Sequence, residues 1–141
     1  MEQHIDKLLE QLIRHEGMEL KPYKCTSDKL TIGVGRNLQD VGITKEEALV
    51  LLENDVKNVE QQLKHYMPWS ETLDPVRRAA LINFVFNVGI GTALKFENAM
   101  AALKQSDYDT AAAELLNSRW STQVGSRAQE LAAQMRTGSW Q

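Results

Sequence analysis

The stretch HEGMELKPYKCTSDKLTIGVG, residues 15–35, is where a helical pattern gives way to a β pattern. Before it, apolar residues recur every three or four positions, which predicts an amphipathic helix over residues 2–15 that Gly17 ends. Within it, apolar side chains alternate with small or polar ones around the turn TSDK, which predicts a β-hairpin between Pro22 and Leu38. The stretch therefore predicts an α+β fold.

The rest of the chain has helical patterns. Thr44 and Glu47 form a capping box, which predicts a long helix to about His65, and Asp74 with Pro75 predicts the start of the next helix. That next segment, VRRAALINFVFNV, is apolar nearly all round, so we expect it at the buried centre of the fold. Further helices are expected at about 93–104, 108–117 and 125–135. We expect a mostly helical fold with one small hairpin.

Composition limits the class of protein. With 141 residues and no repeat or linker, the chain is expected to form one domain, and its net charge of −3 argues against a nucleic-acid partner. A single cysteine excludes an internal disulfide, and three histidines without paired spacing argue against a metal site, so we expect no metal and no cofactor. Charges interrupt the first residues, so we expect neither a signal peptide nor a membrane anchor, and synthesis in the cytoplasm.

Three residues of the opening stretch could carry chemistry: Glu16, Cys25 and Thr31. A glutamate at a helix end that faces a hairpin can be partly desolvated and stay protonated near neutral pH. The hairpin can present Cys25 and Thr31 from adjacent strands, which suits displacement at a carbon between an acid and a group that handles water. Each also has a structural interpretation: a solvated carboxylate, a small buried thiol and a β-branched strand residue.

The order EG, YKCT, LTIGVGRNL resembles the catalytic region of the phage lysozymes of glycoside hydrolase family 24. That family has Glu, eight residues, Asp, five residues and Thr, and Glu16, Cys25 and Thr31 keep both spacings. The resemblance continues through ITKEEA, VRRAALINFVFNVG, AAAELLNSRW and SRAQELAAQMRTGSW, and so covers nearly the whole chain. Two departures stand out: Cys25 replaces the usual aspartate, and the connection between GRNL and GITKEEA is much shorter than in the T-even enzyme.

The resemblance implies a lysozyme-like fold of two lobes within one domain, residues 1–141. The small lobe would hold the hairpin and span about residues 15–58. The larger helical lobe would comprise about residues 1–14 and 67–141, and the helix that begins at Thr44 would join the two lobes.

The resemblance implies that Glu16 is the general acid and that Thr31 holds a water molecule by its hydroxyl. Cys25 has three interpretations: it positions or deprotonates the attacking water, it attacks the sugar directly, or it is inert. Either active role benefits from a lowered pKa, for which Lys24 and Lys29 are the candidate causes.

Other positions follow from the same resemblance. Substrate-binding roles are implied for Asn37, Phe86, Asn87 and Glu114, and a core role in its apolar helix is the alternative for Phe86. Supporting roles fall to Arg127, which would orient Glu16, and to Gly33 and Gly35, which would let sugar approach the backbone. Arg36 is expected to pair with Asp55, and Trp120 and Trp140 are expected to be structural residues of the helical lobe.

The implied function is that of an endolysin, a muramidase that hydrolyses the β-1,4 bond between N-acetylmuramic acid and N-acetylglucosamine in bacterial peptidoglycan. One alternative is a catalytically weak peptidoglycan-binding protein that has lost the carboxylate, and another is a chitin-active or transglycosylating relative. We expect a monomer without nucleic acid or stable membrane association, made in the host cytoplasm and acting on the wall after release.

Overall fold

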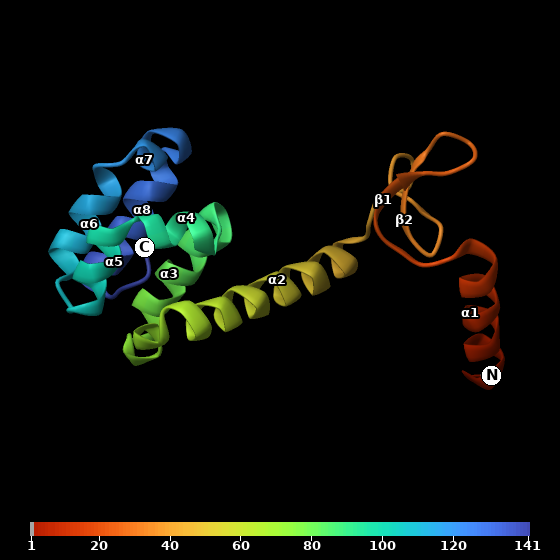
Figure 1. The fold of residues 1–141 in the computed structure, drawn as a ribbon, viewed down its shortest axis with the longest axis horizontal. Helices are drawn as coiled ribbons and strands as arrows, with labels where there is room; N and C mark the ends of the chain where they lie inside the picture. Colours follow the sequence, from red (N-terminus) through yellow and green to blue (C-terminus); the bar gives the residue numbers. More distant parts are fainter. Residues whose placement is uncertain (1) are drawn as a thin grey trace. The chain divides into compact units, whose positions relative to one another are not determined.

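The computed structural model describes residues 2–141, and these are mostly helical, with one small antiparallel sheet (Figure 1). This confirms the mostly helical α+β class. The chain divides into two compact units, Met1–Val50 and Leu51–Gln141. The division falls inside the long helix α2 (Lys45–Tyr66), the helix predicted to join two lobes. The predicted composition of those lobes stays a prediction.

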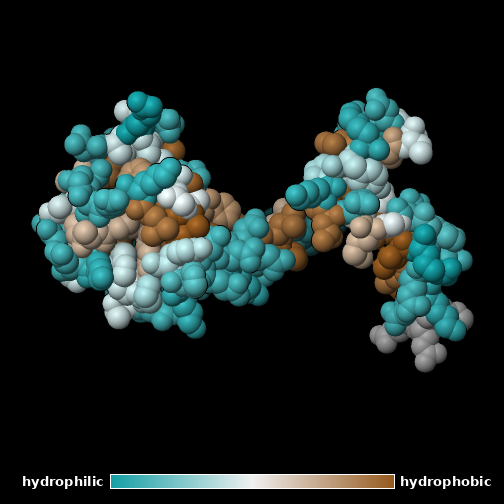
Figure 2. All heavy atoms as spheres, in the orientation of Figure 1, coloured by the Kyte–Doolittle hydropathy of each residue, from teal (hydrophilic) through white to brown (hydrophobic). Residues whose placement is uncertain are grey.

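The first unit begins with α1 (Glu2–Glu16), as predicted. Gly17 ends the helix because it adopts a φ of +79°, and its amide donates to the carbonyl of Ile13 at 2.8 Å. The apolar stripe of α1 is exposed, as the hydrophobic atoms along that helix show (Figure 2). It consists of Ile5, Leu8, Leu9, Leu12 and Ile13, each 38–52% exposed.

The predicted hairpin is confirmed and extended. Strands β1 (Glu19–Lys24) and β2 (Leu30–Gly33) pair antiparallel, and a two-residue strand β3 (Arg36–Asn37) pairs with β2, giving the order β1-β2-β3. The added strand follows from the positive φ values of Gly33 and Gly35, which reverse the chain immediately after β2.

The second unit contains one 3₁₀ helix and six α-helices among the described residues, besides the end of α2. They are η1 (Pro68–Thr72), α3 (Pro75–Val88), α4 (Ile90–Lys95), α5 (Glu97–Lys104), α6 (Tyr108–Leu116), α7 (Arg119–Val124) and α8 (Ser126–Thr137). The helix expected at about 93–104 is therefore two helices that meet at Phe96, and α7 was not predicted.

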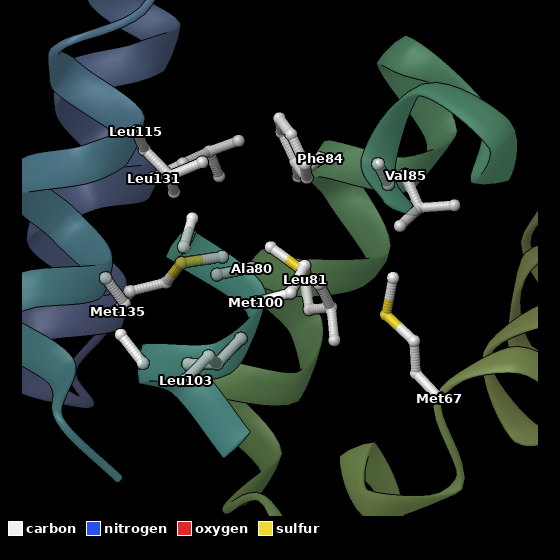
Figure 3. Packing of buried hydrophobic residues seen from close by; sticks show 14 of the residues in the cluster. Met67, Ala80, Leu81, Phe84, Val85, Met100, Leu103, Leu115, Leu131 and Met135 are labelled. Atoms are coloured by element: carbon white, nitrogen blue, oxygen red, sulfur yellow. The ribbon is translucent and has the colours of Figure 1, made fainter. Parts of the chain in front are cut away.

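Helix α3 is the buried centre, as predicted. Side chains of α5, α6 and α8 converge on its apolar face, which includes the fully buried Leu81 and Phe84 (Figure 3). The ring of Phe84 packs edge-on against those of Phe96 and Trp120, with centroids 5.0 and 4.9 Å apart. The structural role of Trp120 is confirmed. The prediction for Trp140 is wrong, because Gly138 ends α8 in a left-handed conformation and leaves the indole 70% exposed.

Candidate active site

One face of the small sheet gathers several of the predicted site residues. The register places Thr31 of β2 opposite both Tyr23 of β1 and Asn37 of β3. Directly opposite residues share a face of a sheet, and so do residues two apart on one strand. Tyr23, Cys25, Thr31 and Asn37 therefore lie on the same face, which we call the thiol face. Tyr23 was expected as a strand residue but not as a neighbour of Cys25 and Thr31, although its alternation with Cys25 was the available signal.

A tight turn fixes Cys25 at the end of β1. Its amide donates to the carbonyl of Lys29 at 3.0 Å, and its carbonyl accepts from the amide of Asp28 at 2.9 Å. Asp28 adopts a φ of +61°, a conformation that Asp tolerates better than most residues. The sequence CTSDK therefore forms a three-residue hairpin loop that closes next to the thiol.

The turn also makes the thiol more acidic. Hydrogen bonds from the backbone of Lys29 and of Ser27, followed by one from the hydroxyl of Thr31, hold the pKa of Cys25 below its ordinary value. The expected cause was a lysine ammonium, so that part of the prediction is wrong: backbone donors lower the pKa, because the turn points them at the sulfur.

Thr31 is buried, with 3% of its surface exposed. Its hydroxyl lies 2.8 Å from the carbonyl of Lys29, to which it donates, and it is also within hydrogen-bonding reach of the thiol of Cys25. A hydroxyl has one hydrogen, so it serves one of these acceptors at a time. Rotation of that hydrogen from the carbonyl to the sulfur can therefore stabilise a thiolate when it forms.

Glu16, the predicted general acid, belongs to the same unit and is the last residue of α1. A Cβ atom added to Gly35 would come within 2.9 Å of the Glu16 Oε2 atom, so the carboxyl group lies directly against the backbone of the β2–β3 turn. Glu16 is exposed, and residues 1–50 therefore do not supply the burial that the sequence analysis expected. Gly33 has the same left-handed φ but no atom within 4 Å of such a Cβ.

Arg36 closes the sheet against the start of α2. Its guanidinium makes two hydrogen bonds to the carboxylate of Glu47, at 2.7 and 2.8 Å, and a third to the carbonyl of Gly42 at 3.2 Å. Within residues 1–50 its partner is therefore Glu47, which the capping box holds at the helix start, and the expected pairing with Asp55 of the second unit stays a prediction. The amide of Thr44 donates to Glu47 at 2.9 Å, and the amide of Glu47 donates back to the Thr44 hydroxyl at 3.1 Å.

The remaining predicted residues belong to the second unit. Phe86 is 42% exposed, and it borders an apolar groove of about 350 Å³ together with Leu52, Ile82, Trp140 and others. The exposed ring is available to a ligand, in contrast to the core role that an apolar helix would favour. Arg127 lines the same groove, and its guanidinium donates to the Asn83 side chain at 2.7 and 3.1 Å.

Asn87 and Glu114 occupy different surroundings in that unit. The side-chain oxygen of Asn87 accepts from the indole nitrogen of Trp120 at 2.7 Å, so half of its amide is used in packing. Its other half, the NH₂ group, remains able to donate to a ligand. Glu114 lines a smaller pocket of about 250 Å³ beside Phe96 and Asn117.

The structure thus brings Cys25, Thr31 and Asn37 together on one sheet face, with Glu16 against Gly35 in the same unit. Phe86, Asn87, Glu114 and Arg127 are placed in the second unit. Among residues 2–141, no group of three or more acidic, histidine or cysteine side chains is arranged to hold a metal ion. No helix of this described part is both long and apolar enough to cross a membrane.

A mostly helical α+β fold with one small antiparallel sheet after the first helix is consistent with the class of lysozyme-like proteins. The chain belongs to the phage lysozyme family, whose sequence profile matches residues 13–136. Membership points to a glycoside hydrolase with peptidoglycan as its substrate.

Three relatives illustrate the similarity. The chain is 26% identical to a probable T4-type lysozyme of Dictyostelium discoideum, over 96% of each chain. It is 33% identical to an endolysin of Acyrthosiphon pisum secondary endosymbiont phage 1, over 77% of this chain and 73% of that one. It is 30% identical to a SAR-endolysin of bacteriophage PS119, over 74% of this chain and 62% of the relative.

Proposed function

We propose that this chain is an endolysin-type muramidase, which hydrolyses the β-1,4 bond between N-acetylmuramic acid and N-acetylglucosamine. The observation that carries the proposal is that one unit holds both a carboxyl group at the end of α1 and, on its sheet, a thiol whose pKa is lowered. Glu16 lies against Gly35, and the turn around Cys25 directs hydrogen-bond donors at its sulfur. Family membership and the names of the relatives support the same function.

Glu16 donates its proton to the glycosidic oxygen as the bond to that oxygen breaks. The attacking water transfers a proton to the thiolate of Cys25 as its oxygen bonds to the sugar carbon. The products are two neutral sugar ends, the neutral thiol of Cys25 and the carboxylate of Glu16. A proton passes from that thiol to Glu16 through solvent before the next turnover. The hydroxyl of Thr31 stabilises the thiolate before the water attacks. In the direct alternative the thiolate bonds to the sugar carbon as the glycosidic bond breaks, and water then displaces the sulfur from that carbon. These two displacements retain the anomeric configuration, whereas a single attack by water inverts it.

The second unit supplies sugar contacts in this proposal. The exposed ring of Phe86 offers a face for a sugar, and the amide of Asn87 and the carboxylate of Glu114 offer hydrogen bonds. The side-chain amide of Asn37 offers hydrogen bonds on the thiol face. Gly33 leaves room for sugar next to strand β2. The protein acts as a monomer on the cell wall after release from the host cytoplasm, without nucleic acid or stable membrane association.

The experiment is a turbidity assay on bacteria stripped of their outer membrane. Glu16→Gln keeps the shape of the side chain but removes the transferable proton, so lysis should fall by at least ~10²-fold. Glu10→Gln, on the same helix, is the matched control and should lyse normally. Normal lysis by Glu16→Gln would contradict the role of Glu16, and no lysis by the wild type would favour a wall-binding protein. Mass spectrometry of the released fragments identifies the bond and the configuration of the product.

A further inference from the structure

Asp40 lies in the short connection between β3 and α2, and its carboxylate reaches the thiol face. We propose that Asp40 is a positioning residue, which holds the ammonium of Lys29 away from the thiol of Cys25 and so controls how readily that thiol ionises. Only the consequence for lysis rests on the proposed function. The effect of Asp40 and Lys29 on the ionisation of Cys25 does not require that the protein hydrolyse peptidoglycan.

Lys29 is placed where it could reach the thiol. It lies opposite Cys25 across the turn, since the amide of Cys25 donates to its carbonyl at 3.0 Å. Opposite residues in an antiparallel pair have Cβ atoms only about 5 Å apart, and the flexible four-carbon stem of a lysine spans more than that distance. The ammonium could therefore approach the sulfur if nothing else held it.

Asp40 competes for that ammonium. Its Oδ2 atom lies 3.3 Å from the Nζ atom of Lys29. Asn37 fixes Asp40 in place, because its side-chain oxygen accepts from the Asp40 amide at 3.0 Å and its NH₂ group donates to the carboxylate at 3.2 Å. The carboxylate is thus held firmly, whereas the thiol is neutral until it ionises, so Lys29 pairs with Asp40.

The path of the short connection between β3 and α2 determines where the carboxylate of Asp40 lies. The amides of Leu38 and Gln39 both donate to the carbonyl of Leu30, at 2.8 and 3.2 Å, and those of Val41 and Gly42 donate to the carbonyl of Asn37. These bonds turn the chain back over the end of β2. Asp40, at the middle of the turn, is carried to Lys29 as a result.

The other titratable groups near the hairpin do not replace this pair. Lys24 of β1 is one residue from Cys25, so alternation directs it to the opposite sheet face. Tyr23 shares the thiol face, Asp28 belongs to the turn, and Glu16 lies against Gly35 at the end of α1. The hydrogen bonds that lower the pKa of Cys25 come from backbone groups and a hydroxyl, which agrees with an ammonium that is held elsewhere.

The full-length protein tests the proposal through the rate of Cys25 alkylation by iodoacetamide, followed by intact mass across a pH series. Asp40→Asn frees Lys29 and should move the midpoint of the rate profile down by about 0.5 pH unit, which is about threefold faster alkylation below the midpoint. Lys29→Met leaves Asp40 unpaired and should move the midpoint up. The double variant should keep a midpoint close to that of Lys29→Met, because Asp40 acts on the thiol through Lys29.

Asp28→Asn is the matched control, because it removes the same charge from the same hairpin at a residue that tolerates the left-handed conformation. Its effect should be the same with or without Lys29. An Asp40→Asn shift that persists unchanged in the Lys29→Met background would overturn the proposal, because Asp40 would then act on the thiol without Lys29. Absence of any shift would overturn it as well.

The alkylation rate can be measured whether or not the protein lyses bacteria, and the variants are expected to fold like the wild type. The two side chains are 39% and 51% exposed, and exposed pairs contribute little stability, so thermal unfolding of the variants should match that of the wild type. If Cys25→Ala lyses bacteria normally, the proposed role of the thiol fails while the alkylation result still stands. If Cys25 is needed, Asp40→Asn should also move the thiol-dependent limb of the lysis profile to lower pH.

Discussion

Gly35 shows how a single residue without a side chain can fix a carboxyl group. It and Gly33 have nearly the same φ, +71° and +70°, so alanine at either position is strained to a similar extent. Only at Gly35 would the added Cβ meet Glu16, at 2.9 Å. The flexible side chain of Glu16 can move away from an added Cβ at little cost in stability, but its carboxyl group then no longer lies against the backbone of residue 35.

Gly35→Ala should therefore lose more lytic activity than Gly33→Ala, while the two variants unfold at similar temperatures. Turbidity assays and thermal melts on the same preparations measure both quantities. Equal loss of lysis in the two variants would mean that the contact with Glu16 is unimportant for the reaction.

Cys25 carries the second prediction at this scale. Cys25→Asp should remain active, because it restores a group that accepts a proton from water, whereas Cys25→Ala should lose most activity and stay folded. Alkylation should inactivate the enzyme faster as pH rises, and at lower pH than for an ordinary thiol because the pKa of Cys25 is lowered. If Cys25→Ala lyses cells like the wild type and the alkylated protein stays active, the thiol has no catalytic role.

The residue types of this site could be predicted from spacing, but their surroundings could not. The sequence shows Glu16, Cys25 and Thr31 at intervals typical of the family. It does not show that a turn directs the backbone donors of Ser27 and Lys29 at the sulfur, because that geometry depends on the left-handed conformation of Asp28.

At the scale of elements, the start of α2 is the clearest match between sequence and structure. Thr44 and Glu47 predict a capping box by their spacing alone, and both bonds of the box form. The break between α4 and α5 could not be predicted in this way. Phe96 leaves the helix with a ψ of 58° and packs against Phe84, a contact between segments that local patterns do not specify.

The same junction predicts how stability responds to acid. Arg36, which donates to the carboxylate, and the capping bond from Thr44 lower the pKa of Glu47 from 4.5 to about 2. A lowered pKa in the folded state means that this stabilisation is complete above about pH 4.5 and is lost as pH falls towards 2. The difference in unfolding free energy between the wild type and Glu47→Gln should shrink over that range in urea titrations. Glu46→Gln is the control, and a constant difference would contradict the assignment.

At the scale of the whole molecule, the two units differ in how much apolar surface they bury. The hydrophobic cluster runs from Val59 to Met135 and so lies wholly within the second unit. Among residues 5–50, Thr31 is the one buried residue, and the apolar stripe of α1 is exposed. The sequence predicted which segments are helical, but it could not show this difference, because burial depends on which helices share a core.

We therefore predict that a fragment of residues 51–141 folds without the first unit. Its core rests on Phe84, Leu81 and Met135, whose side chains are fully buried. Burial on this scale supports cooperative folding in a chain of about 90 residues, although such a domain has little stability to spare. The fragment should melt cooperatively and keep the near-ultraviolet dichroism of Trp120. Within it, Phe84→Ala should cost about 3–5 kcal/mol and abolish the transition, whereas truncation of the exposed Trp140 should not. A broad melt without near-ultraviolet signal in the unmodified fragment would show that its helices need residues 1–50 to pack.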